Sequence, residues 1–69
     1  MVKTIKDYDG RWTVFNTITG ETATIISIKE HGFLASKGTR YRVDVKGRTV
    51  KSMIDHFATA RAEAKKYVK

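Results

Sequence analysis

Single glycines divide the first fifty residues of this chain into short segments and limit what it can fold into. They fall at Gly10, Gly20, Gly32, Gly38 and Gly47, the chain has no proline, and each glycine is typical of a turn. The segments between them are rich in β-branched and aromatic residues and predict strands: RWTVFNTI from Arg11, ETATIISIKE from Glu21, TRYRVDV from Thr39 and RTVKS from Arg48. We therefore expect two β-hairpins, which turn at ITGE and at Lys46–Gly47, joined by a loop over 31–38.

From about Ser52 the apolar spacing becomes that of a helix. One helical face carries residues that recur at alternating spacings of four and three: Met53, Phe57, Ala60, Ala64 and Tyr67. Two starts are open. Ser52 with Asp55 has the spacing of a capping box, but the strand can also run on to Met53 or Ile54, with Thr59 as the cap of a shorter helix. Either version ends with basic residues that suit the helix dipole.

These elements predict an α+β fold of one domain over residues 1–69. We expect a small antiparallel sheet of three to four strands, followed by one C-terminal helix packed on one face of the sheet. With 69 residues and 41% hydrophobic content, a single core is near the lower limit for folding alone. Trp12 is expected in this core or at its rim. A marginal core and open sheet edges also favour a homodimer.

The charge of the chain points to a polyanionic partner. Its 14 Lys and Arg outnumber 7 Asp and Glu, which gives a net charge of +7. The absence of cysteine and of any long apolar segment predicts a soluble protein of the cytoplasm, with no membrane contact. His31 and His56 lie on separate elements without metal-ligand spacing, and no nucleophile motif or phosphate loop is present. We expect no cofactor, no metal and no enzymatic activity.

The basic residues concentrate in the predicted second hairpin, KGTRYRVDVKGRTVKS. A turn at Lys46–Gly47 would pair Arg42 with Lys51 and place both on a polar face opposite Tyr41, Val43, Val45 and Val50. Such a face either keeps an open sheet solvated or contacts DNA, because a narrow ribbon can enter the major groove while Lys and Arg bind phosphates. The candidate DNA-binding residues are Arg11, Lys37, Arg40, Arg42, Lys46, Arg48 and Lys51.

Two segments, GTRYRVDVKGRTVKS and the later FATARAEAKKYV, carry a family resemblance. The span Lys37 to Val68 resembles the three-stranded DNA-binding modules at the front of phage and transposon tyrosine recombinases, and those of AP2-type transcription factors. The resemblance implies double-stranded DNA bound through the sheet, with Arg40, Arg42, Arg48 and Lys51 at or near the contact. Because 69 residues cannot also contain a catalytic domain, we expect a stand-alone module of a phage or mobile element.

The sequence thus predicts a small basic protein that binds double-stranded DNA in a regulatory or architectural role. The alternative is an accessory or inhibitor module that docks on an acidic surface of a larger partner, such as a polymerase. A third hypothesis is single-stranded nucleic acid stacked on an exposed aromatic residue, either Trp12 or Phe15.

Overall fold

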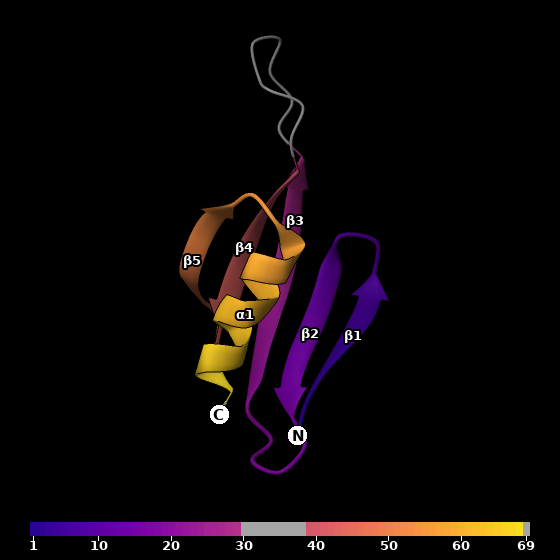
Figure 1. Cartoon of the computed structure of the whole chain (residues 1–69), viewed down its shortest axis with the longest axis vertical. Coiled ribbons are helices and arrows are strands. Elements are labelled where there is room, and N and C mark those ends of the chain that lie inside the picture. Colours follow the sequence, from indigo (N-terminus) through magenta and orange to yellow (C-terminus); the bar gives the residue numbers. More distant parts are fainter. Residues whose placement is uncertain (30–38, 69) are drawn as a thin grey trace, which may run out of the picture.

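The computed structural model describes residues 1–29 and 39–68, which form five strands and one helix. The elements are β1 (Val2–Tyr8), β2 (Arg11–Asn16), β3 (Thr22–Lys29), β4 (Thr39–Val45), β5 (Arg48–Ile54) and α1 (Phe57–Tyr67). All five strands pair antiparallel in sequence order, so the sheet is a simple meander with β1 and β5 at its edges. Figure 1 shows α1 crossing one face of the sheet in front of β3 and β4. The predicted loop over 31–38 lies outside the described residues.

The expected sheet of three to four strands is wrong, because the sheet has five. The missing strand is β1, which pairs along β2 from Val2 opposite Asn16 to Tyr8 opposite Arg11. Its apolar Val2 and Ile5 are three residues apart and therefore point to opposite faces, so the segment lacks the alternation of a half-buried strand. The turn signal was present, since Asp9–Gly10 follows β1 directly and Gly10 has a φ of +91°.

The core lies between α1 and the sheet. Alternation along β2, β3 and β4 brings apolar side chains to the helix side, where Ala60 and Ala64 let the helix approach closely. Within the described part of the chain, the buried residues are Val14, Ala23, Ile25, Val43, Ile54, Ala60, Ala64 and Val68. Trp12 packs against this core, as predicted, and its ring centroid lies 4.7 Å from that of Phe57 and 6.0 Å from that of Tyr41. The three aromatic rings fix the start of α1 over the sheet.

The helix begins later than a capping box at Ser52 would place it. Ser52 lies within β5, which runs on to the buried Ile54, and α1 starts at Phe57 with His56 as its N-cap. Thr59, the other expected cap, lies inside the helix, and His56 makes no side-chain capping bond. Burial of Ile54 in the core explains why the strand continues past Ser52. No helix among the described residues is long and apolar enough to cross a membrane.

The β4–β5 hairpin turns where predicted but then shifts its register. Lys46 and Gly47 have φ values of +53° and +78°, and Val45 lies opposite Arg48 and Asp44 opposite Thr49. Beyond Thr49 two irregularities insert extra residues into β5, so that Lys51 lies opposite Val43 and Ile54 opposite Tyr41. The expected pairing of Arg42 with Lys51 is therefore wrong, and the like-charge pair does not form.

Replacing Met53 with glycine is expected to stabilise the protein. Met53 is 64% exposed and has a φ of +58°, so its side chain contributes little packing while its backbone lies in the region that favours glycine. Relief of this strain should exceed the cost of a more flexible unfolded chain, for a net gain of about 0.5 kcal/mol. Urea unfolding followed by Trp12 fluorescence measures the change. Met53→Ala keeps the strain and should not stabilise, and destabilisation by Met53→Gly would contradict the strained backbone.

Candidate nucleic-acid interface

The sheet face opposite α1 carries three arginines that the sequence analysis named as candidate DNA-binding residues. Arg11 comes from β2, and Arg40 and Arg42 come from β4, at positions that alternate with the buried Val43 and with Trp12 and Val14 of the helix side. Arg42 lies opposite Ile26 and Arg40 opposite Ile28. We call this surface the open face, because no helix of the described residues covers it.

Arg42 is held by a carboxylate on its own strand. Its terminal NH2 group donates a hydrogen bond of 3.1 Å to Oδ2 of Asp44. Its Nε lies 3.1 Å from Oδ1 of the same carboxylate, but makes no hydrogen bond. The hydroxyl of Thr49 donates to Oδ1 of Asp44 over 2.8 Å, which fixes the carboxylate from β5. The charge of Arg42 is thus offset within the protein.

Arg40 and Arg11 have carboxylate partners as well. Arg40 forms an ion pair with Asp55, which follows β5. Arg11 Nε lies 3.7 Å from Oδ2 of Asp7 in β1, and Thr13 Oγ1 donates to that oxygen over 2.6 Å. Asp7 and Asp55 thus lie beside these arginines, in addition to Asp44 within the hairpin. Three arginines and three carboxylates cancel, so these pairs give the open face little positive charge.

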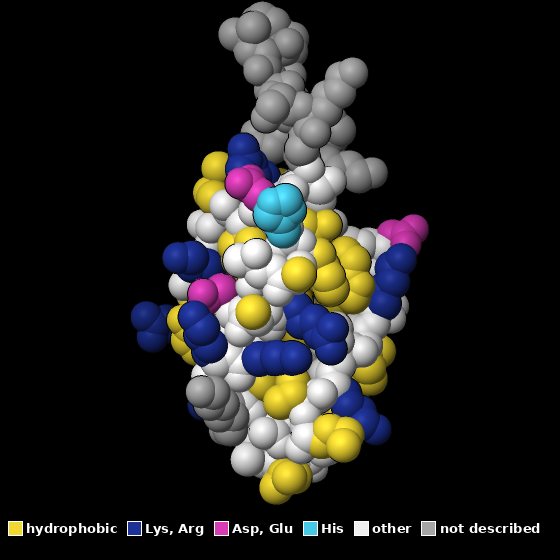
Figure 2. Space-filling model, viewed as in Figure 1, with side chains coloured by type: hydrophobic (Ala, Val, Ile, Leu, Met, Phe, Trp, Pro, Cys, Tyr) yellow, Lys and Arg dark blue, Asp and Glu magenta, His cyan; other side chains and the backbone are white. Residues whose placement is uncertain are grey.

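Unpaired positive charge lies instead at one edge of the sheet. Lys46 is in the β4–β5 turn, and Arg48 and Lys51 are on β5. All three are exposed, and within the described ranges none of them has a carboxylate within ion-pair distance. We call these three residues the basic edge. Figure 2 shows Lys and Arg side chains along the side of the molecule where Figure 1 places β5.

The helix contributes further cations on its outer surface. Arg61 and Lys65 follow Phe57 at intervals of four, so they lie on the flank of α1 that begins at Phe57. Both are exposed and make no ion pair with a described residue, whereas Lys66 Nζ lies 3.1 Å from Glu63 Oε1. Lys and Arg side chains over α1 are visible in Figure 2. These residues lie on a different element from the basic edge and are not part of it.

The structure thus separates the predicted DNA-binding residues into two groups. Lys46, Arg48 and Lys51 form the basic edge, whereas Arg11, Arg40 and Arg42 lie on the open face with acidic partners. Lys37 lies outside the described residues. The carboxylates that offset the open face, Asp7 and Asp55, were missed. Asp7 precedes Arg11 by four residues in the unpredicted hairpin, and Asp55 meets Arg40 only because of the register of β5.

The width of the sheet bears on what the open face can contact. Neighbouring strands lie about 4.8 Å apart, so five strands span roughly 19 Å, whereas the major groove of B-DNA is about 12 Å wide. The whole face is therefore too wide to enter the groove. Because β4 also pairs with β3, the β4–β5 hairpin is not a free ribbon, and the sheet can approach the duplex with its β5 edge or the Lys46–Gly47 turn.

Comparison of the chain with protein-family models, curated proteins and solved structures gave no match. The resemblance of residues 37–68 to the recombinase and AP2-type modules therefore stays a prediction. Any functional conclusion rests on the side chains described above.

Proposed function

We propose that the protein binds double-stranded DNA through the basic edge, with Lys46, Arg48 and Lys51 on backbone phosphates. The observation that carries this proposal is the distribution of the carboxylates. The described carboxylates neutralise the arginines of the open face, but none of them lies within ion-pair distance of the three cations at the edge. An unpaired exposed cation can exchange its water and counterions for phosphate, whereas Arg40 and Arg42 must first give up a hydrogen bond to a carboxylate.

The shape of the edge supports the same proposal. The tight turn at Lys46–Gly47 brings Lys46 to the end of the β4–β5 hairpin, and Arg48 and Lys51 continue from it along β5, the edge strand. Irregular pairing along β5 makes this edge a poor template for another strand, so the edge is better suited to side-chain contacts than to sheet extension. Lysines at a sheet edge also oppose aggregation, and the salt series described below separates this role from DNA binding.

Duplex DNA fits this surface better than a single strand does. Binding of a single strand along a groove relies on aromatic rings on which successive bases stack. Trp12, Tyr41 and Phe57 pack on one another, with ring centroids 4.7–6.0 Å apart, and no aromatic residue belongs to the basic edge. Contacts from the edge would therefore be electrostatic and directed at the backbone. Such contacts give little sequence preference.

A salt series tests the proposal. Fluorescence anisotropy of a labelled blunt-ended duplex is measured with the purified protein at increasing salt concentrations. Three phosphate contacts predict that log affinity falls with log salt with a slope of about −2.7. The absence of binding at low salt by a folded protein would contradict the proposal. That result would favour the alternative in which the positive charge docks on an acidic protein.

A further inference from the structure

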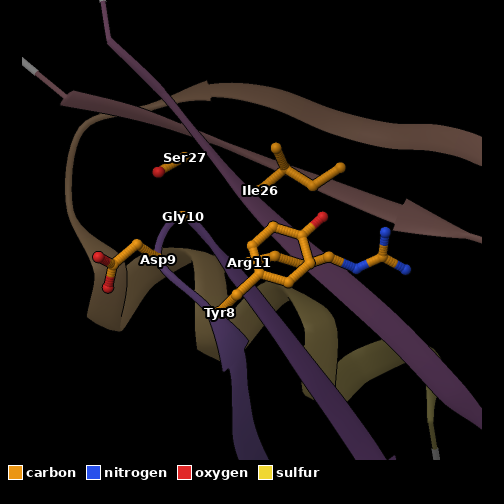
Figure 3. A pocket seen from close by; sticks show the side chains of 6 residues that line it. All are labelled: Tyr8, Asp9, Gly10, Arg11, Ile26 and Ser27. Carbon is orange, nitrogen blue, oxygen red and sulfur yellow. The ribbon is translucent and has the colours of Figure 1, made fainter.

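A shallow pocket lies where the β1–β2 turn meets β3, several strands away from the β5 edge. It has a volume of about 390 Å³ and is lined by Tyr8, Asp9, Gly10, Arg11, Ile26 and Ser27 (Figure 3). Pairing of β2 with β3 ends at Arg11 and Ile26, whereas β3 continues to Lys29 beside β4. Beyond Ile26, of the described residues only the β1–β2 turn lies next to β3 on that side, and the pocket lies beside this turn.

Gly10 allows the turn to approach β3 closely. The backbone N–H of Ser27 donates to the carbonyl oxygen of Gly10 over 2.8 Å. A Cβ atom at Gly10 would lie 2.9 Å from Ser27 Oγ, and its φ of +91° favours glycine. A backbone hydrogen bond between the β1–β2 turn and β3, next to the last pair of β2 and β3, thus fixes the floor of the pocket.

Tyr8 supplies an accessible aromatic ring. The residue is 61% exposed, and its ring forms one wall of the pocket. Trp12, Tyr41 and Phe57 differ from it, because their rings pack on one another against the core. An exposed tyrosine ring beside an apolar side chain, here Ile26, can stack on a planar group such as a nucleobase.

Arg11 lies directly opposite Tyr8 in the β1–β2 pairing, and the Asp7 carboxylate orients its side chain. Its Nε faces Asp7 at 3.7 Å, and the Asp7 carboxylate is itself held by the hydroxyl of Thr13 at 2.6 Å. The Arg11 guanidinium makes no hydrogen bond to a described residue, so its N–H groups remain available. A guanidinium positioned in this way can donate two hydrogen bonds to a phosphate.

Each end of the pocket holds one ion pair, Arg11 with Asp7 and Asp9 with Lys6. Figure 3 shows the guanidinium of Arg11 on one side of Tyr8 and the carboxylate of Asp9 on the other. Asp9 Oδ1 lies 3.0 Å from Lys6 Nζ, so the carboxylate is positioned by an ion pair. A phosphate would bind the N–H groups of Arg11 that no described residue uses, and would be repelled by the exposed Asp9 carboxylate.

We propose that this pocket binds one nucleotide, with its base stacked on Tyr8 and its phosphate on Arg11. The ligand is a free nucleoside monophosphate or a single unpaired nucleotide of a strand, since both present the same base and phosphate. The pocket is distinct from the basic edge, and its occupation does not depend on duplex binding.

The fluorescent nucleotide 2-aminopurine riboside 5′-monophosphate provides the test, because stacking on an aromatic ring quenches its emission. The wild-type protein should quench it saturably. Tyr8→Leu should lower the affinity about tenfold or more, whereas Tyr8→Phe, which keeps the ring, should retain it. Tyr67→Leu is the matched control, because Tyr67 is a 41% exposed tyrosine on α1, away from the pocket. It should bind like the wild type.

Arg11→Gln tests the phosphate contact. It should weaken binding of the monophosphate but leave binding of the corresponding nucleoside unchanged. A short single strand with one 2-aminopurine, measured in parallel, distinguishes an unpaired nucleotide from a free one, and quenching of either supports the pocket. Equal affinity of Tyr8→Leu and the wild type, or no saturable quenching at millimolar nucleotide, would overturn the proposal. The affinity of Tyr8→Leu for a blunt duplex should equal that of the wild type. A negative result for the pocket therefore does not contradict DNA binding by the basic edge.

Discussion

Neutralising Arg48 and Lys51 together, as Arg48→Gln/Lys51→Gln, is expected to weaken duplex binding about tenfold or more at low salt and to reduce the salt slope by about two. The two side chains are exposed cations of the basic edge with no carboxylate beside them among the described residues. Their phosphate contacts would release counterions, and the variant loses that contribution. Anisotropy titrations of a labelled blunt duplex at several salt concentrations measure both quantities.

The double variant Arg40→Gln/Arg42→Gln is the matched control. It also removes two positive charges, but from the open face, where Asp55 and Asp44 already offset them. Its duplex affinity and salt slope should stay close to those of the wild type. If instead this variant loses binding and the edge variant retains it, DNA contacts the open face, and the assignment of the basic edge is wrong.

Truncating Ile25 to alanine is expected to destabilise the fold by about 3 kcal/mol. Ile25 is a residue of β3 that belongs to the core between the sheet and α1, and it has no exposed surface. The change removes three carbons from a tightly packed site and leaves a cavity. Since a chain of this size has a total stability of roughly 3–10 kcal/mol, much of the variant should be unfolded near body temperature. Urea unfolding followed by circular dichroism gives the free energy of unfolding.

Ile28→Ala is the control on the same strand. Ile28 lies on the open face and is 42% exposed, so its truncation should cost about 1 kcal/mol or less. Similar losses for the two variants would mean that the open face is as well buried in solution as the helix side. That result would contradict a core confined to one face of the sheet.

Local patterns in the sequence predicted the elements whose signals are short-range. Turn chemistry predicted the Lys46–Gly47 turn, and strand alternation predicted that Val43 and Trp12 lie on the helix side. Helical periodicity predicted that Ala60 and Ala64 share one face of the helix. Those features do not depend on which strands are neighbours. The edge strand β1 was missed. It pairs with one strand only and has no buried residue, so its sequence carries no alternation of apolar and polar residues.

The register of β5 could not be predicted, and the candidate site depended on it. Two irregularities move Lys51 away from Arg42 and carry the chain far enough for Asp55 to meet Arg40, which is 15 residues earlier. Composition showed that the hairpin is basic, but it could not show which cations are neutralised. Ion pairs formed in the folded chain decide which cations are neutralised. They are the reason that we propose the DNA contact at the basic edge and not on the open face.

The location of the bound duplex tests the central claim most directly. Amide ¹H–¹⁵N correlation spectra of the labelled protein are recorded while a blunt-ended duplex is added at low salt. The account predicts that the shift changes centre on 46–51, the turn and the first half of β5, with little change at Arg11, Arg40 or Arg42. Changes centred on those three arginines and on Ile26 between them would contradict it and return DNA to the open face.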